Sequence, residues 1–236
     1  KLMKNKSLNK FYNDDSILYE IGIDEAGRGP MVGRVYSAGV ILPKNTDFQF
    51  ELLKDSKKFT SEKKINEVAD YIKKNALYWT VQYEDETIID KINIRNATHS
   101  AMHKCINNII NNYNVNNELA HNKYYLLIDG NDFKPFTYFK NNIIQQISHI
   151  TIEGGDNKYC SIAAASILAK VERDSYIKNI TNEYKKLNEC YNIEKNKGYG
   201  TSKHLEGIKK YGISPWHRKT YGLCKHAIIN PLEFYL

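Results

Sequence analysis

The chain has 236 residues, of which 42% are hydrophobic and 26% charged, with a formal net charge of +7 at pH 7. This length suits one large domain or a domain with a small appendage, and no apolar run approaches the ~20 residues that span a membrane. The positive charge favours a polyanionic partner, although many basic proteins bind none, and the dispersed cysteines exclude a paired zinc site or a disulfide-stapled scaffold.

The first half of the chain predicts strands interspersed with helices. The polar residues 1–17 are expected to form a flexible N-terminal segment. The predicted strands are 18–23, 35–42 and 77–83, the first two joined as an antiparallel pair by a glycine-rich loop. The predicted helices are 61–75, capped by Thr60 or Ser61, and 84–113, broken near Asn93.

The second half predicts strand–helix units followed by helices alone. After a polar linker at 111–123, strands are predicted at 124–128 and 143–152, separated by a surface excursion over 130–142. Helices are predicted at 159–179, 182–190 and 202–211, with a loop at 192–201. This order indicates an α/β protein with a mixed sheet flanked by helices. We predict a catalytic domain at 18–190 and a C-terminal helical substrate-binding extension at 191–236.

Four acidic residues follow apolar runs: Asp24, Glu25, Asp129 and Asp156. Singly, each has an ordinary interpretation as a solvated strand end, a turn or a helix N-cap. If folding brings all four to one edge of the sheet, their charges repel unless cations neutralise them. Carboxylates without histidine or cysteine select Mg²⁺ or Mn²⁺, and two such ions support an in-line phosphodiester displacement. The hypothesis is therefore a two-ion nuclease site.

A glycine-rich loop follows the first two acids directly. Adjacent strand residues point to opposite faces, so Asp24 and Glu25 are expected to share a site only because the strand ends there. Gly27 and Gly29 lack a Cβ, so the backbone of this loop can approach a ligand closely. The loop is not a dinucleotide fingerprint, because Gly33 has the wrong spacing and a strand follows in place of a helix.

These motifs together resemble those of the type 2 ribonuclease H family, the ribonuclease HII enzymes. The family's first motif, Asp-Glu-Ala-Gly-Arg-Gly-Pro, stands at 24–30. Further matching segments are 55–58, 92–94 with Ala97 and Thr98, 129–131, 155–156, 161–171 with Arg173 and Asp174, and 198–201. They cover about residues 19–221 in the family's order. The segment at 198–201 favours the single-chain bacterial-like form over the eukaryotic multi-subunit form.

The resemblance implies a ribonuclease H-like sheet and assigns Asp24, Glu25, Asp129 and Asp156 as the catalytic and metal-binding acids, with two Mg²⁺ or Mn²⁺ ions. It implies an endoribonuclease that hydrolyses the RNA strand of RNA–DNA hybrids and cuts on the 5′ side of single ribonucleotides in duplex DNA. In the family, the glycine loop and a tyrosine read the ribose 2′-hydroxyl, which distinguishes RNA from DNA. The corresponding residues here are Gly27, Arg28, Gly29 and Tyr199.

Several polar and basic residues are candidates for contacts with substrate phosphates: Ser56, Lys57, Asn93, Thr98, Lys170, Arg173 and the pair at 203–204. Each alone also fits a solvated basic surface, and Lys170 and Arg173 have the alternative of tethering Asp174. Together they are expected to make binding sensitive to salt.

Two rival functions remain at this stage: a ribonuclease H-fold DNA nuclease and a non-catalytic hybrid-binding module. The first has no need of the glycine loop and Tyr199, and the second is expected to lack one or more of the acids. We expect a monomer that binds RNA–DNA hybrids or ribonucleotide-containing duplex DNA and no membrane. Its location is expected to be intracellular, with the compartment and any sliding-clamp or replication partner left open.

Overall fold

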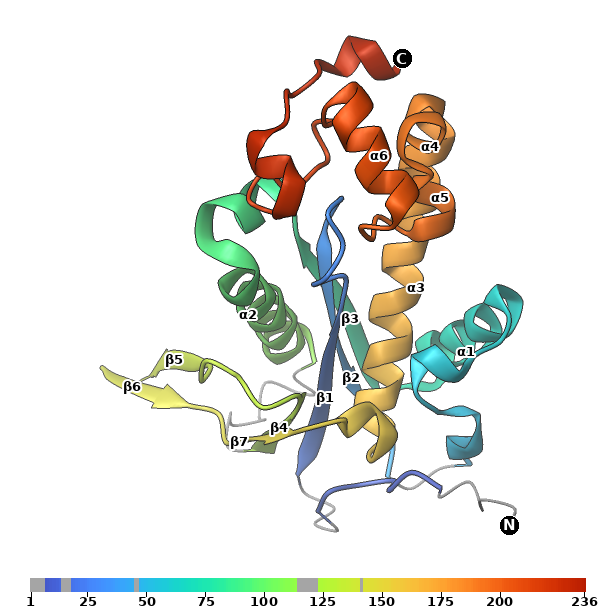
Figure 1. Ribbon diagram of the computed structural model, residues 1–236. Coiled ribbons are helices and arrows are strands. Elements are labelled where there is room, and N and C mark those ends of the chain that lie inside the picture. Colours follow the sequence, from blue (N-terminus) through green and yellow to red (C-terminus); the bar gives the residue numbers. More distant parts are fainter. Residues whose placement is uncertain (1–6, 14–17, 45–46, 114–122, 141) are drawn as a thin grey trace.

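A computed structural model describes residues 7–13, 18–44, 47–113, 123–140 and 142–236 (Figure 1). Its centre is a five-stranded sheet with the order β3-β2-β1-β4-β7. These strands are β1 (Tyr19–Ala26), β2 (Val35–Ile41), β3 (Tyr78–Glu84), β4 (Tyr124–Asp129) and β7 (His149–Ile152). β1 is antiparallel to β2 and parallel to β4, so the predicted mixed sheet is confirmed.

Helices cover both faces of this sheet (Figure 1). Ala38 and Val40 of β2 face α1 (Glu62–Asn75) and α3 (Cys160–Glu183), whereas Ile41 faces α2 (Glu86–Asn112). This alternation follows from the two-residue period of a strand. Ser61 caps α1 through its hydroxyl, and α2 is broken at Asn93, where φ is 66°, as the sequence predicted.

Small residues allow the start of α3 to lie directly against β1. A Cβ on Gly22 would stand 2.2 Å from the carbonyl carbon of Ser161, a separation that no side chain tolerates. The run Ala163, Ala164 and Ala165 continues this close contact and is fully buried. The approach brings α3 beside the part of β1 that carries Asp24, which interacts with Ser166 of the helix.

Several predicted elements differ from the structure. β1 continues to Ala26, so Asp24 and Glu25 lie within the strand and not at its end. The excursion at 130–142 contains β5 (Thr137–Lys140), which pairs with β6 (Ile143–Gln146) in a separate two-stranded sheet. The predicted strand 143–152 is therefore two strands, because Ile147 is buried between them and its amide donates to the carbonyl of Phe136.

The C-terminal region packs onto the end of α3. It contains α4 (Lys185–Tyr191), α5 (Ile193–Asn196) and α6 (Ser202–Tyr211), so the predicted loop at 192–201 holds a short helix. Its apolar core also includes Met31 and Val32, which follow the glycine loop. The end of the chain is thus packed against the loop that follows β1 (Figure 1).

Some predictions concern residues at the margins of the described ranges. Most of the predicted linker 111–123, and residues 1–6 and 14–17 of the predicted flexible segment, lie outside the described residues. Within that segment, Asn9 pairs with Tyr159, and the amide of Tyr12 donates to Glu20. In the part of the chain that the structure covers, no helix is long and apolar enough to cross a bilayer.

Candidate active site

The central strand carries the first two acids. Asp24 is buried with 5% of its surface exposed, and its Oδ1 accepts the backbone N–H of Glu25 at 2.7 Å. Burial raises the pKa of Asp24 well above its usual value, and the charges of Glu25 and Asp129 raise it further. The two neighbours share a site although both lie within β1, which corrects the expectation that the strand must end first.

The other two acids reach the same edge through parallel strands. β1, β4 and β7 run parallel, so their carboxyl ends meet on one side of the sheet. Asp129 is the last residue of β4, and Asp156 lies in a 3₁₀ turn (Gly155–Asn157) just after β7. The backbone N–H of Gly155 donates to Oδ1 of Asp129 at 2.6 Å, which joins these two segments.

Asp129 is the electrostatic centre of the four acids. Its charge raises the pKa of Asp24, of Glu25 and of Asp156, in each case adding to the larger effect of burial. Asp55, near the start of a second 3₁₀ turn, also raises the pKa of Asp156. A cluster in which Asp24, Glu25 and Asp156 have raised pKa values is stabilised by a positive charge placed among them.

A pocket of about 400 Å³ lies in front of the acids. Its walls include Asp24, Glu25, Asp129, the loop residues Gly27, Arg28 and Gly29, and Tyr199. Asp156 is not among the lining residues, and it connects to the site through its electrostatic interaction with Asp129.

The donor set fits hard divalent cations in its chemistry. Asp129 and Asp156 each use Oδ1 for a protein hydrogen bond, from the amide of Gly155 and the side chain of Asn157. Their second oxygens can therefore serve an ion, and oxygen ligands suit Mg²⁺ or Mn²⁺. Among the described residues, no three acid, histidine or cysteine side chains already converge on one point. Binding of an ion would therefore draw these carboxylates together.

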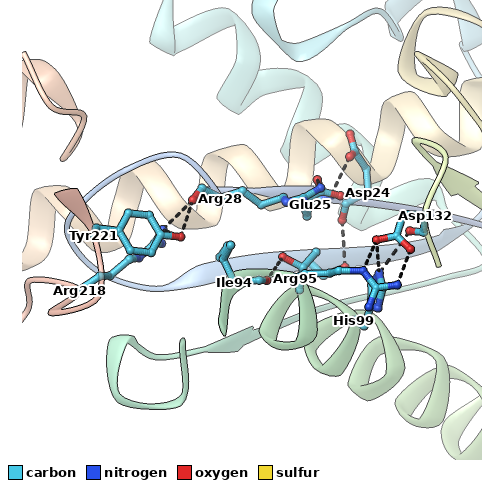
Figure 2. A network of polar contacts seen from close by, with 11 residues as sticks. Asp24, Glu25, Arg28, Ile94, Arg95, His99, Asp132, Arg218 and Tyr221 are labelled. Carbon is cyan, nitrogen blue, oxygen red and sulfur yellow. Dashed lines mark hydrogen bonds and ion pairs between the residues drawn. The ribbon is translucent and has the colours of Figure 1, made fainter. Parts of the chain in front are cut away.

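The glycine loop is packed tightly between two side chains. A Cβ on Gly27 would stand 2.4 Å from Nε of Arg173, and a Cβ on Gly29 would stand 3.2 Å from the ring of Tyr199. The side chain of Arg28 pairs with Glu25 at 3.3 Å, while its carbonyl oxygen accepts from Arg218 and Tyr221 (Figure 2). The loop therefore presents its backbone to the pocket beside an aromatic face.

Four of the predicted phosphate contacts line the pocket: Ser56, Lys57, Lys170 and Arg173. Partial burial by itself lowers the pKa of Lys57, but Asp156, Asp55 and the other acids raise it overall. Lys170 donates to Asp174 at 2.8 Å, so the tethering alternative describes its contact in this structure. Burial lowers the pKa of Arg173 to about 10, and this side chain donates to the carbonyl of Lys197.

The remaining predicted contacts lie away from this pocket. Thr98 is buried, and its hydroxyl donates to the carbonyl of Ile94 within α2, while Asn93 accepts the amide of Asn96 at the helix break. His204 is fully buried and bonded to the carbonyl of Tyr199, so it is not a surface contact for phosphate. The matching segments and basic composition that marked these residues as candidates gave no information about which of their side chains reach the pocket.

Several pocket residues were missed by sequence reasoning. Ser166, Asp174, Asn196 and Lys197 also line the pocket. Ser166 lies within the matched helix motif, and Asp174 is a matching residue and the expected tethering partner, but neither was predicted to line the site. Nothing in the local pattern marks Asn196 or Lys197. The buried Arg218 lies in the tail, where the sequence shows only an aromatic and basic composition.

The fold and the pocket together define a class of protein: a nuclease of the ribonuclease H fold with a carboxylate site at the edge of its sheet. The family model for Ribonuclease HII matches residues 21–224. The chain belongs to the ribonuclease HII family. It is thus a type 2 ribonuclease H, an endoribonuclease of RNA–DNA hybrids from a family that depends on divalent metal ions.

A curated relative agrees with this assignment, and two solved structures agree with the fold. Ribonuclease HII of Bacteroides fragilis is 44% identical over 206 residues, which cover 87% of this chain and 90% of the relative. Ribonuclease H2 from Pyrococcus horikoshii OT3 has a TM-score of 0.65 at 20% identity, covering 88% of this chain and 96% of that chain. Bst-RNase HIII in complex with Mn²⁺ has a TM-score of 0.56 at 15% identity, covering 84% of this chain and 71% of that chain.

Proposed function

We propose that this enzyme hydrolyses the RNA strand of hybrids and also incises on the 5′ side of single ribonucleotides embedded in duplex DNA. The observation that carries the proposal is one pocket that is lined by three of the four predicted catalytic acids, Asp24, Glu25 and Asp129, together with the glycine loop and Tyr199. A general DNA nuclease has no use for a glycine-rich backbone surface beside a tyrosine. A hybrid-binding module has no use for a buried, mutually repelling acid cluster.

The proposed catalytic residues are Asp24, Glu25, Asp129 and Asp156, which would hold two Mg²⁺ or Mn²⁺ ions. Ions at such a site supply charge neutralisation, an activated water and stabilisation of the leaving oxygen. Lys57 adds a positive charge beside the acids, and Lys170 and Arg173 also line the pocket.

Ribose selection is assigned to the backbone of Gly27, Arg28 and Gly29 and to Tyr199. Polar groups arranged for a 2′-hydroxyl lose their partner when deoxyribose binds, and this loss penalises the wrong substrate. Tyr199 is half exposed and lies against Gly29, so its ring and hydroxyl are available to a nucleotide in the pocket. We propose that residues 191–236 bind substrate by contributing Tyr199, and that the enzyme acts as a monomer.

Cleavage of a labelled duplex with one ribonucleotide, with and without Mg²⁺ or Mn²⁺, tests the proposal. Asp129→Asn should bind the duplex but cut it more than about 100-fold more slowly, beyond the 10–100-fold typical of losing a residue that only supports a ligand. Asp132→Asn is the matched control, because Asp132 is an exposed carboxylate that pairs with Arg95 outside the pocket (Figure 2). It should cut like the wild type.

Each rival function predicts a different outcome. Equal cleavage of the all-DNA duplex would identify a DNA nuclease, and binding without any cut in either metal would identify a binding module. Cleavage by Asp129→Asn at the wild-type rate would contradict the assignment of the acids.

A further inference from the structure

A single buried arginine of the C-terminal extension forms hydrogen bonds to the glycine loop. Arg218 is fully buried, and its guanidinium donates to the carbonyl oxygens of Gly27 at 2.6 Å and Arg28 at 2.9 Å on the arm that enters the loop. It also donates to the carbonyls of Gly33 at 2.8 Å and Arg34 at 3.2 Å on the arm that leaves it, and to the hydroxyl of Tyr221. The five N–H donors of an arginine are thereby used.

These bonds determine which way the loop amides point. In a planar trans peptide, the carbonyl and the N–H of the same unit point in opposite directions. The carbonyls of Gly27 and Arg28 are turned toward Arg218, so the amide N–H groups of Arg28 and Gly29 are turned away from it. Neither amide has a protein acceptor within the described residues, and both residues line the pocket.

His217, the residue before Arg218, is connected through His204 to Tyr199, the second proposed ribose-selecting group. The carbonyl of Tyr199 can only accept, so Nδ1 of His204 carries the proton and donates to it at 2.9 Å. Nδ1 of His217 accepts the amide N–H of Ser214 at 3.0 Å, so its Nε2 carries the proton and donates to Nε2 of His204, also at 3.0 Å. Burial lowers the pKa of both imidazoles, which keeps this pair neutral.

Backbone hydrogen bonds fix the positions of His217 and Arg218 relative to the glycine loop. The amide of Arg218 donates to the carbonyl of Met31, and the amide of Gly33 donates to the carbonyl of Trp216, both at 2.8 Å. Val32 and His217 therefore form an antiparallel β-bridge, which joins residues 216–218 to residues 31–33. One rigid segment thus contacts the glycine loop directly and Tyr199 through His204.

From this arrangement we propose that His217 and Arg218 are positioning residues that set the ribose selectivity of the enzyme. Arg218 orients the loop amides, and His217 orients Tyr199. The inference rests on the proposed assignment of Gly27, Arg28, Gly29 and Tyr199 to ribose selection. It adds that this selectivity is controlled from the tail, by residues that touch neither substrate nor metal.

Selectivity is measured in an Asp129→Asn background as the ratio of dissociation constants for two duplexes that differ by one 2′-hydroxyl. Arg218→Lys keeps the charge but cannot span both arms of the loop, and the ratio should fall about tenfold. His217→Asn keeps an acceptor for Ser214 but loses the donor to His204, and the ratio should also fall. His217→Gln restores a donor near the Nε2 position and should recover part of the loss.

A matched control separates positioning from stability. Tyr191→Phe removes a buried hydroxyl that bonds Tyr235 and Gly212 in the same C-terminal core, without contact to the loop. It should lower the melting temperature and leave the ratio unchanged. If Arg218→Lys fails to fold, Tyr221→Phe removes only the hydroxyl that donates to the Arg28 carbonyl, and the ratio should fall two- to threefold.

The outcomes distinguish control of selectivity by His217 and Arg218 from ribose selection by the glycine loop itself. An Asp129→Asn parent that does not discriminate between the duplexes would contradict ribose selection by the loop and the inference with it. A parent that discriminates, with His217→Asn and Tyr221→Phe variants that discriminate equally well, would overturn the inference alone. A drop in the ratio for Tyr191→Phe as large as for the His217 variant would also overturn it.

Discussion

At the scale of single residues, the site contains buried acidic groups that destabilise the folded protein. Asp24 is buried beside two other carboxylates, and its pKa is raised by burial first and by Glu25 and Asp129 next. Such a residue opposes folding at neutral pH and is kept for its chemistry. A buried acid whose pKa is raised by neighbouring carboxylates is thus the residue-level sign of an ion-binding site.

The sign of this effect gives a stability prediction. Because the pKa of Asp24 is higher in the folded protein, its contribution to stability is present below the unfolded value near 3.8 and is lost as pH rises through the folded value. Without metal, Asp24→Asn should therefore raise the melting temperature at pH 8 by about 2–4 °C, which corresponds to about 1 kcal/mol, and by less at pH 4.5.

Thermal unfolding with and without Mg²⁺ checks this prediction. Mg²⁺ should raise the melting temperature of the wild type more than that of Asp24→Asn. The variant should also fail to cut the duplex. Asp132→Asn is the control with the opposite sign, since Arg95 lowers the pKa of Asp132 through its hydrogen bond. A metal-free Asp24→Asn protein less stable than the wild type at pH 8 would refute the account.

Sequence reasoning located the residues that carry chemistry better than those that hold them in place. Asp24, Glu25, Asp129 and Asp156 follow apolar runs and stand in a recognisable order, and the structure brings them into one electrostatic cluster. Arg218 acts through bonds to residues about 190 positions away in the sequence. No periodicity or local motif encodes such a contact.

At the scale of elements, the placement of the site depends on how closely β1 and α3 approach. Gly22 and the alanines of α3 remove the side chains that normally separate a helix from a sheet. The small residues of the helix were visible in the sequence, whereas the break at Ile147 was not. That break depends on the burial of Ile147, which follows four exposed residues of β6.

Gly22→Ala tests this contact. The new Cβ would meet the backbone of Ser161 and Ile162 at 2.2–2.5 Å, and neither chain can move without displacing a strand or a helix. The expected loss is about 3 kcal/mol or more of unfolding free energy, which is about 6 °C or more in melting temperature.

The control for this variant is Gly154→Ala, which has open space around the new Cβ but a φ of +61°. This variant should lower the free energy of unfolding by only about 1–2 kcal/mol, because alanine is strained in the left-handed conformation. Similar losses for the two variants would show that steric contact with α3 is not what requires a glycine at position 22.

At the scale of the whole molecule, the chain combines a negative pocket with an overall charge of +7. The acids attract cations to one point, while lysines and arginines elsewhere attract the phosphate backbone of a duplex. Lys57 is a positive charge within the negative pocket. It lines the pocket, and its charge is stabilised by Asp156, Asp55 and Asp24. We expect its ammonium group to contact a phosphate near the cut.

The dependence of duplex binding on salt tests this placement. Each phosphate neutralised by the protein contributes about −0.9 to the slope of log affinity against log salt concentration. Lys57→Gln should reduce the magnitude of that slope by about 1, because one phosphate contact is lost. Lys63→Gln removes an equal charge from an exposed position on α1 outside the pocket and should leave the slope unchanged. If both variants change the slope equally, net charge alone governs binding, and Lys57 has no direct phosphate contact.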